Sequence, residues 1–218
     1  MAPRFFVVIG LGRFGTAVAR TLVAEGQTVL ALDQDMARVQ ELSHVLPRVA
    51  RCDATDIEAL RVLGVPGADT AVVAVGDSVE ASVLATVNLK ELGVRRVVAK
   101  ATSEAHGKAL ERCGADRVVY PQRDMGIRVA HNLVSANVQD YVRLSDSHSM
   151  VEMVASPGMV GRSLAELALG RRYGVNVVAI RRGQRVIVSP RAEEVIREGD
   201  VLVLIGSDEG IREMEEAS

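Results

Sequence analysis

The feature that most constrains this chain is a set of three glycines that directly follows an apolar run over residues 5–9. Gly10, Gly12 and Gly15 have the spacing Gly-x-Gly-x-x-Gly, and a second apolar run over residues 28–32 ends in Asp33. A strand, a glycine turn, a helix, a second strand and an acidic residue at its end make up a dinucleotide-binding unit. The pattern therefore predicts a parallel βαβ fold that holds an adenine nucleotide, with its phosphates over a helix N-terminus and a ribose on Asp33.

Residues 1–120 alternate between short β-branched runs and stretches with helical periodicity. The predicted strands are residues 5–9, 28–32, 49–52, 70–75, 97–101 and 117–120, and the predicted helices are residues 13–25, 36–44, 56–63, 78–92 and 103–113. Thr55 and Asp77, each three residues before a glutamate, are the predicted N-caps of the third and fourth helices. Strands that are apolar throughout and separated by helices indicate a parallel sheet covered on both faces. We therefore predict an α/β, doubly wound, Rossmann-like domain over residues 1–121.

The pattern changes after Pro121. One amphipathic helix is expected over residues 124–136, followed by strands at 138–144, 150–155, 175–181, 185–188 and 201–205 and by helices at 163–171 and 208–216. The sequence Arg182-Gly183-Gln184 between two alternating runs predicts a hairpin turn. This part of the chain is β-rich and contains no glycine-rich phosphate loop. We predict a connector over residues 122–140 and a small α+β domain over residues 141–218.

Each position of the glycine motif has a predicted role. Gly10 permits the tight turn, Gly12 lets the backbone approach a phosphate, and Gly15 lets the helix pack closely on the sheet. Arg13 falls in the first turn of the predicted helix, where the helix dipole disfavours a cation. A bound polyphosphate would reverse that preference, which makes Arg13 a candidate phosphate ligand. The alternative is a solvated arginine that points away from the helix.

The ends of the other predicted strands supply the remaining candidates. Asp33 suits a ribose with free hydroxyls and disfavours NADP, unless it caps the next helix instead. Asp35 is a weaker candidate and is better explained as that cap. Asp53 follows the third strand, where the adenine lies in such domains, or is a loop carboxylate beside Thr55. Lys100, near the end of the fifth strand, either neutralises phosphate or is an exposed lysine. The other residues assigned to the nucleotide are Phe14, Cys52, Ala54, Val75 and Gly76.

Composition and missing motifs argue against several other functions. The net charge of −2 argues against nucleic-acid binding, and no apolar stretch approaches the ~18 residues of a membrane span. We find no secretory signal pattern, no metal-ligand spacing, no nucleophile elbow and no histidine at the end of a predicted strand. A regulatory sensor is therefore favoured over an enzyme, and a small NAD-dependent oxidoreductase is the alternative.

Six stretches of the chain resemble a known family. They are VVIGLGRFG, LDQD, VVAVGDSVEAS, VVAKA, GADRVVYPQRDMG and REGDVLVLIG, and they are similar to segments of bacterial RCK proteins, which regulate K⁺ conductance. The resemblance covers residues 4–210 and is greatest to the soluble gating subunits of Ktr/Trk-type potassium transporters. GADRVVYPQRDMG is more specific than the glycine motif, because ordinary dehydrogenases have no reason to carry it.

The resemblance implies a fold and an assembly. It implies a Rossmann-like RCK N-domain, a crossover helix and a small RCK C-domain. It further implies dimers that assemble into an octameric ring beneath a membrane-embedded Ktr/Trk-type K⁺ transporter. The chain would then be cytoplasmic and held at the inner face of the membrane through that partner.

The resemblance also implies ligands. ATP and ADP compete for the N-domain site in the Ktr branch, the Trk branch also takes NAD(H), and some C-domains bind cyclic di-AMP, to which residues 177–181 could contribute here. Family members often carry a cation-binding glutamate where this chain has Gln122. Because a neutral amide is a poorer ligand for a hard divalent cation, a metal at this position is not expected.

The resemblance assigns roles to individual residues by their position. The terminal phosphate of ATP is expected near Arg13, from the same or a neighbouring subunit. The ribose is expected at Asp33, the adenine at Asp53 and Ala54, and the phosphates near Lys100.

Overall fold

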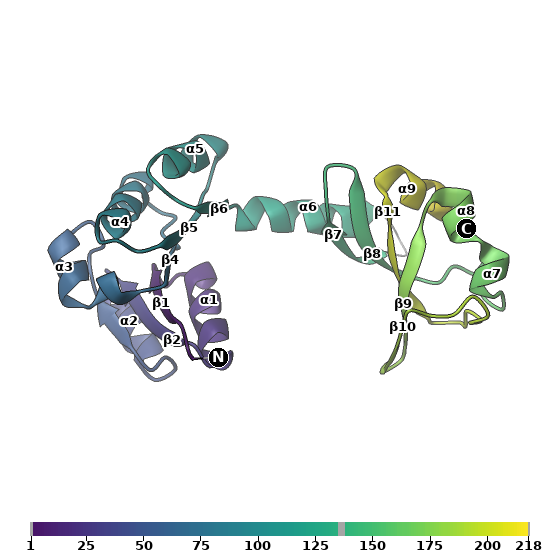
Figure 1. The fold of residues 1–218 in the computed structure, drawn as a ribbon, viewed down its shortest axis with the longest axis horizontal. Helices are drawn as coiled ribbons and strands as arrows, with labels where there is room; N and C mark the ends of the chain where they lie inside the picture. The colour runs from purple at the N-terminus through teal and green to yellow at the C-terminus, as the bar shows by residue number, and fades with distance from the viewer. Residues whose placement is uncertain (1, 135–137, 218) are drawn as a thin grey trace. The chain divides into compact units, whose positions relative to one another are not determined.

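The computed structural model describes residues 2–134 and 138–217 and divides into two compact units, Met1–Arg123 and Asp124–Ser218 (Figure 1). Each unit has its own β-sheet. The first unit has a hydrophobic core on each face of its sheet, and the second unit has a separate core. Helix α6 (Pro121–Val134) begins in the first unit and continues in the second. The candidate nucleotide-binding residues all precede residue 124, so the first unit carries the site.

The first unit contains a six-stranded sheet in the order β3-β2-β1-β4-β5-β6, with every pair of neighbours parallel. The first strand of the chain, β1, pairs with β2 on one side and with β4 on the other. The chain thus winds outward in opposite directions from the middle of the sheet, which confirms the predicted doubly wound, Rossmann-like fold. The strands are β1 (Phe5–Ile9), β2 (Thr28–Asp33), β3 (Val49–Arg51), β4 (Thr70–Val73), β5 (Arg96–Lys100) and β6 (Arg117–Val119).

Five α-helices cover the two faces of this sheet. Val8 of β1 packs with Ala19 of α1 and Leu42 of α2 in one core. Its neighbour Val7 belongs to the other core, which contains side chains of α3, α4 and α5. Burial on both faces explains why these strands are apolar at successive positions rather than at alternate ones. The helices are α1 (Arg13–Ala24), α2 (Met36–Ser43), α3 (Ile57–Val62), α4 (Val79–Glu91) and α5 (Glu104–Arg112), with a 3₁₀ turn, η1 (Val65–Gly67), before β4.

Both predicted N-caps in this unit are wrong by one residue. The hydroxyl of Thr55 donates to Oδ1 of Asp53 at 2.8 Å, so Thr55 is not the cap of α3. Asp56 caps that helix instead and accepts two backbone N–H groups of its first turn. Ser78, rather than Asp77, caps α4. Each helix start does have an oxygen-bearing cap, one residue later than predicted, and at α3 the predicted cap Thr55 is bound to Asp53 instead.

In the second unit a five-stranded antiparallel sheet has the order β10-β9-β11-β8-β7. Leu202 and Leu204 of β11 enter one core with Val151 and Met153 of β8 and with Met214 of α9. Buried residues alternate along both strands, as expected for a sheet with one covered face. The strands are β7 (Val138–Arg143), β8 (His148–Val154), β9 (Asn176–Arg182), β10 (Arg185–Val188) and β11 (Val201–Ser207), and the helices are α7 (Leu164–Leu167), α8 (Leu169–Tyr173) and α9 (Asp208–Glu216).

Three sequence predictions in this unit can be compared with the structure. The hairpin is confirmed, because Arg182 of β9 pairs with Arg185 of β10. The single helix predicted over residues 163–171 is wrong: Ala168, with φ of 46°, is left-handed and separates α7 from α8. Helix α6 begins at Pro121, three residues earlier than predicted, at a position where proline loses no hydrogen bond. Its predicted end, Ala136, lies outside the described residues.

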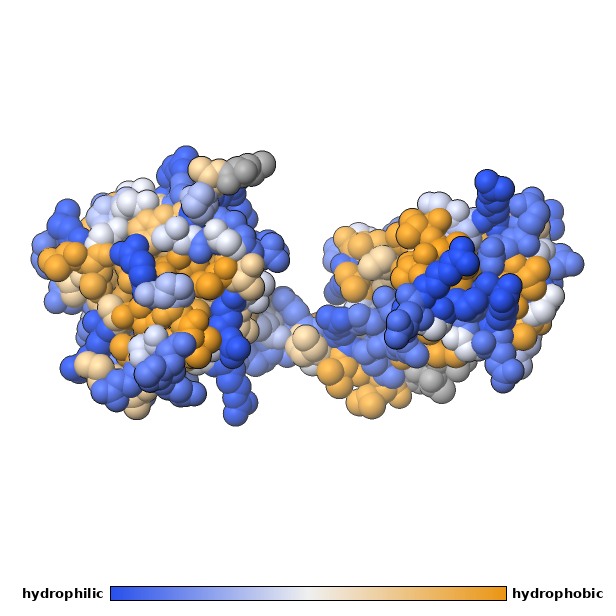
Figure 2. Space-filling model, turned by 90° about the horizontal axis from the view of Figure 1, so that it is seen from below, coloured by the Kyte–Doolittle hydropathy of each residue, from blue (hydrophilic) through white to orange (hydrophobic). Residues whose placement is uncertain are grey.

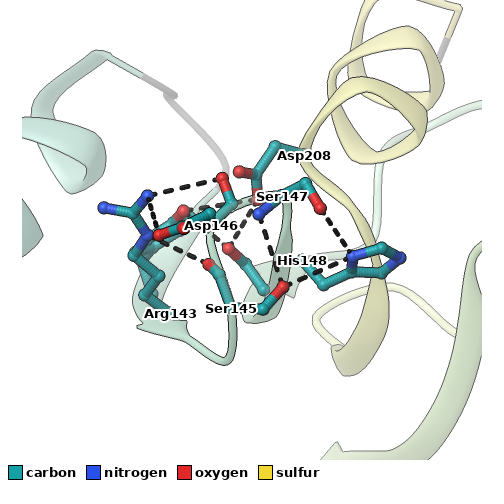
Figure 3. A network of polar contacts seen from close by, with 8 residues as sticks. Arg143, Ser145, Asp146, Ser147, His148 and Asp208 are labelled. Atoms are coloured by element: carbon teal, nitrogen blue, oxygen red, sulfur yellow. Dashed lines mark hydrogen bonds and ion pairs between the residues drawn. The ribbon is translucent and has the colours of Figure 1, made fainter.

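Polar contacts hold the turn between β7 and β8 (Figure 3). The Nε of Arg143 donates to the backbone oxygen of Ser145 at 3.0 Å. The Ser147 hydroxyl lies 3.0 Å from Nδ1 of His148. The backbone N–H of Asp208 donates to the Ser147 carbonyl at 3.0 Å, so the first residue of α9 is tied to this turn.

Apolar side chains reach the surface of both units, where orange areas lie among blue ones (Figure 2). On α6, Met125, Val129 and Leu133 follow one another at four-residue spacing and are 53%, 47% and 80% exposed. Such a spacing places them along one stripe of the helix. Among the described residues, no helix has the length and apolar content that a bilayer crossing requires.

Candidate nucleotide-binding site

The predicted site residues meet at the carboxyl-terminal edge of the parallel sheet. Adjacent strands β1 and β4 are followed by crossovers that leave in opposite directions, so this edge holds a topological switch point. The glycine loop follows β1 and presents the first N–H groups of α1 there, which is a favourable position for an anion. Ligands of doubly wound sheets bind at such a point.

Gly10 and Gly15 are required by close packing, whereas Gly12 leaves open space. Gly10 has φ of +91°, and a Cβ on it would lie 2.9 Å from the backbone nitrogen of Val75. A Cβ on Gly15 would lie only 1.8 Å from the carbonyl oxygen of Gly10, so α1 packs directly on the loop. A Cβ on Gly12 would meet no atom within 4 Å. The geometry therefore agrees with the turn role predicted for Gly10 and the packing role predicted for Gly15, and it leaves room above Gly12.

Asp33 fastens the end of β2 to the glycine loop. Its side chain is nearly buried, and Oδ2 accepts from the backbone N–H of Leu11 at 2.6 Å. Oδ1 accepts from the backbone N–H of Asp35 at 2.8 Å. Asp35 caps α2 by accepting from Ala37, so the alternative that Asp33 caps this helix is wrong and the capping role predicted for Asp35 is confirmed. Arg38, which the sequence interpretation missed, lies 3.5 Å from Asp33 and 3.7 Å from Asp35.

Two cations at this edge are not neutralised within the described parts of the chain. Arg13 is the first residue of α1 and is exposed, and Lys100 is half-buried at the end of β5. Neither side chain has an ion pair or hydrogen bond among residues 2–134 and 138–217. The Lys100 Nζ lies 2.6 Å from the position that a Cβ on Gly76 would occupy, so the missing side chain of Gly76 makes room for this ammonium group.

The candidates after β3 are tied into the protein. Cys52 and Ala54 are largely buried in the core, and burial raises the pKa of the Cys52 thiol. Oδ1 of Asp53 accepts from the backbone N–H of Thr55 at 3.0 Å as well as from its hydroxyl, and these hydrogen bonds lower the pKa of the Asp53 carboxyl. Asp53 therefore is a loop carboxylate bound to Thr55, as one of the two interpretations of the sequence expected. A contact between Asp53 and adenine stays a prediction.

Phe14, Val75 and Gln122 complete the set of predicted residues. Phe14 packs against the core beneath α1, and Val75 packs against the core on the other face of the sheet. Gln122 is exposed in the first turn of α6. Across the residues that the structure describes, no three His, Cys, Asp or Glu side chains are grouped to hold a metal ion.

A buried histidine that the sequence interpretation did not assign to the site lies behind this edge. His106 is in the first turn of α5 and is 3% exposed. Its Nδ1 accepts from the backbone N–H of Thr102 at 3.3 Å and lies 3.2 Å from the Thr102 hydroxyl. Its Nε2 lies 3.2 Å from the hydroxyl of Ser82, a fully buried residue of α4. The sequence offered one indication of this contact. Thr102 lies two residues after β5 and four residues before His106, so the start of α5 brings the histidine back to Thr102.

The burial of His106 predicts an acid-sensitive first unit. Burial lowers the pKa of His106 below its usual 6.5. The imidazole therefore binds a proton more weakly in the folded protein than in the unfolded chain. Stability is therefore unaffected above pH 6.5 and falls as the pH drops below it, by at most about 1.4 kcal/mol per pH unit. Urea titrations between pH 7.5 and 5 measure this slope, and His106→Asn should flatten it. An equal slope in the variant would assign the acid sensitivity to other groups.

Comparison with protein families and solved structures supports this fold. Residues 6–121 match the model of the TrkA-N domain, and residues 149–218 match the model of the TrkA-C domain. The structure is similar to that of the GsuK channel bound to NAD, with a TM-score of 0.53 and 25% identity. That similarity covers 100% of this chain and 39% of the GsuK chain, so this chain spans well under half of the channel protein.

Two curated relatives match along nearly the whole chain. The Ktr system potassium uptake protein C of Bacillus subtilis (strain 168) is 46% identical over 93% of this chain and 91% of its own length. The Ktr system potassium uptake protein A of the same organism is 36% identical over 96% of this chain and 95% of its own length. Both domains and their order agree with the resemblance found in the sequence. The chain therefore belongs to the Ktr/Trk branch of the RCK family.

Proposed function

We propose that this protein is a nucleotide-sensing regulatory subunit of a Ktr/Trk-type potassium uptake transporter. ATP or ADP binds at the carboxyl-terminal edge of the first unit, and the bound nucleotide shifts an assembly that controls the membrane pore. The observation that carries the proposal is a pair of cations, Arg13 and Lys100, at the sheet edge where the open position above Gly12 adjoins the N-terminus of α1. Relatives named as Ktr potassium uptake proteins support the transport role.

Electrostatics favours a polyphosphate at this edge. The N-terminus of α1 adds the positive end of its dipole to the charges of Arg13 and Lys100. The carboxylate of Asp33, near the opposite end of the glycine loop, is already held by two backbone N–H groups. A ribose hydroxyl that joined it would add a hydrogen bond without burying a new charge.

The mechanism that we propose is a population shift. The subunits form dimers and an octameric ring with two shapes. ATP favours the activating shape only to the extent that it binds this shape more tightly than the other shape, and it acts differently from ADP only if this difference is larger for ATP. In this assembly the exposed stripe on α6 forms a contact between subunits. The ring would act at the cytoplasmic face of the membrane through the transporter subunit. Cyclic di-AMP binding by the second unit remains a prediction from the family resemblance, and no divalent cation is expected at Gln122, where the neutral amide is a poor ligand.

Arg13→Ala is expected to remove the discrimination between ATP and ADP. Hydrogen bonds to charged groups contribute about 1.5–3 kcal/mol, so the variant should lose roughly 10- to 100-fold in ATP affinity. ADP affinity should change little, because ADP lacks the terminal phosphate that Arg13 is proposed to contact. Calorimetric titration of nucleotide-stripped protein with ATP and with ADP measures both affinities.

A matched control for this experiment is Arg20→Ala, which removes the same charge two turns further along α1. Arg20 is exposed, and its loss should leave the ratio of the two affinities unchanged. An unchanged ratio in Arg13→Ala would remove Arg13 from the proposed mechanism.

NAD(H) is the second candidate ligand. Asp33 at the end of β2 is placed as in NAD-binding units, and GsuK is described as bound to NAD. A titration with NADH beside ATP and ADP distinguishes the two. A preference for NADH would favour a Trk-like sensor, or an oxidoreductase if a substrate is turned over.

A further inference from the structure

We propose that His106 is a positioning residue of the nucleotide site, which orients Lys100 toward the phosphates by fixing Thr102. This inference rests on the proposed function and adds a residue that does not itself touch the ligand. It concerns the loop after β5, where Lys100 and Thr102 stand two residues apart at the edge of the sheet.

The first step of the argument is the protonation of the imidazole. The backbone N–H of Thr102 donates to Nδ1 of His106, so this nitrogen must be the acceptor. The neutral ring then carries its proton on Nε2, which faces the hydroxyl of Ser82 at 3.2 Å. His106 thus bridges a fully buried residue of α4 and the loop after β5.

The second step is the orientation of Thr102. Its hydroxyl lies 3.2 Å from Nδ1 of His106, and a β-branched side chain held at one branch has its other branch fixed as well. The methyl group, Cγ2, lies 3.9 Å from the position of a Cβ on Gly76. Thr102 is exposed, so without this contact its side chain would be free to rotate.

The third step is the place of Lys100. Its Nζ and Cε lie 2.6 and 3.3 Å from the same Cβ position on Gly76. The Lys100 ammonium and the Thr102 methyl therefore share the space above Gly76, and a fixed methyl group limits the positions open to the lysine. A long lysine side chain loses much rotamer entropy when it is ordered, so a contact that orders it before binding strengthens binding.

The test compares two amide substitutions of His106, one that keeps the hydrogen bond with Thr102 and one that keeps the contact with Ser82. In His106→Asn, the amide oxygen is two bonds from Cβ, as Nδ1 is, and can accept from Thr102. In His106→Gln, the amide nitrogen is three bonds from Cβ, as Nε2 is, and reaches only Ser82. We expect the Asn variant to keep ATP affinity within about twofold and the Gln variant to lose about tenfold, because ordering of the phosphate ligand Lys100 is lost only in the latter. Adenosine, which has no phosphate, should bind both variants equally.

The role of Lys100 is tested by a double-mutant cycle with Lys100→Ala. If His106 acts through Lys100, His106→Gln should have no further effect on ATP affinity in the Lys100→Ala background. Equal ATP affinities of the Asn and Gln variants, or fully additive effects in the cycle, would overturn the inference and leave the proposed function intact. Wild-type protein that binds neither ATP nor ADP would overturn both. Melting temperatures of all variants identify any loss of affinity that comes from unfolding.

Discussion

Gly15→Ala is expected to destabilise the first unit more than any other single methyl group added in the glycine loop. The new Cβ would lie 1.8 Å from the carbonyl oxygen of Gly10 and 3.0 Å from Cβ of Ala74. The loop cannot move aside, because Gly10 donates to the Leu32 carbonyl at 2.8 Å and packs on the backbone of Val75. We expect a loss of about 3 kcal/mol or more, and a fall in melting temperature of about 10 °C.

Gly12→Ala is the matched control, because the same methyl group there meets no atom within 4 Å. It should leave the melting temperature nearly unchanged. Under the proposed function it should still weaken nucleotide binding, since its methyl group enters the space expected for the phosphates. Thermal unfolding by circular dichroism compares the two variants. A Gly15→Ala protein as stable as Gly12→Ala would contradict the close packing of α1 on the loop.

Arg182→Ala is expected to destabilise the second unit by about 3–5 kcal/mol, because it leaves a buried carboxylate without its counter-charge. Asp200 is completely buried and accepts from Nε and Nη2 of Arg182, both at 2.8 Å. The backbone N–H of Arg197 also donates to Oδ2 of Asp200, at 2.9 Å. Arg182 also bonds Glu194 at 3.1 Å, so one guanidinium joins the end of β9 to the segment that precedes β11.

Hydrogen exchange measured by mass spectrometry localises this effect, since one free energy does not describe a protein of two units. Peptides of β9 and β11 should lose protection, whereas peptides of β1 and β4 should keep it. Arg181→Ala is the control: Arg181 is 42% exposed, lies 3.4 Å from a partly exposed Glu152, and should contribute no more than about 1 kcal/mol. Equal effects of the two substitutions would show that burial of Asp200 does not matter.

The same pair predicts how acid acts on the second unit. The hydrogen bonds from Arg182 hold the pKa of Asp200 below its usual 3.8. The stability that this lowered pKa provides is fully present above pH 3.8 and is lost as the pH falls through the lower value in the folded state. Arg182→Ala should therefore be less sensitive to acid below pH 4 than the wild type is.

The topology of the first unit was predictable from short stretches of the chain. Strands such as residues 5–9 are apolar at successive positions, and the glycine spacing permits only a strand-to-helix turn there. Both signals depend on neighbouring residues, so no knowledge of distant contacts was needed. The helix caps show the limit of this reasoning, because Thr55 has the chemistry of a cap and is bound to Asp53 instead.

The break at Ala168 was not predictable, since alanine is a good helix former and rarely adopts a left-handed conformation. The partners of the site residues were also beyond the sequence. Asp33 holds the N–H of Leu11, and Lys100 lies over Gly76, which is 24 positions away in the chain.

The sequence by itself determined the fold class and the edge of the sheet where a nucleotide is expected, because periodicity and glycine spacing are local properties of the chain. The family followed from the resemblance of short stretches such as GADRVVYPQRDMG to RCK proteins. Tertiary structure alone decided which charges at that edge are already paired. It pairs Asp33 with two backbone N–H groups and with Arg38, leaves Arg13 and Lys100 without ion pairs among the described residues, and places the buried His106 behind Thr102. Such contacts join residues far apart in the chain, and their energies depend on burial and on distances that no local pattern contains.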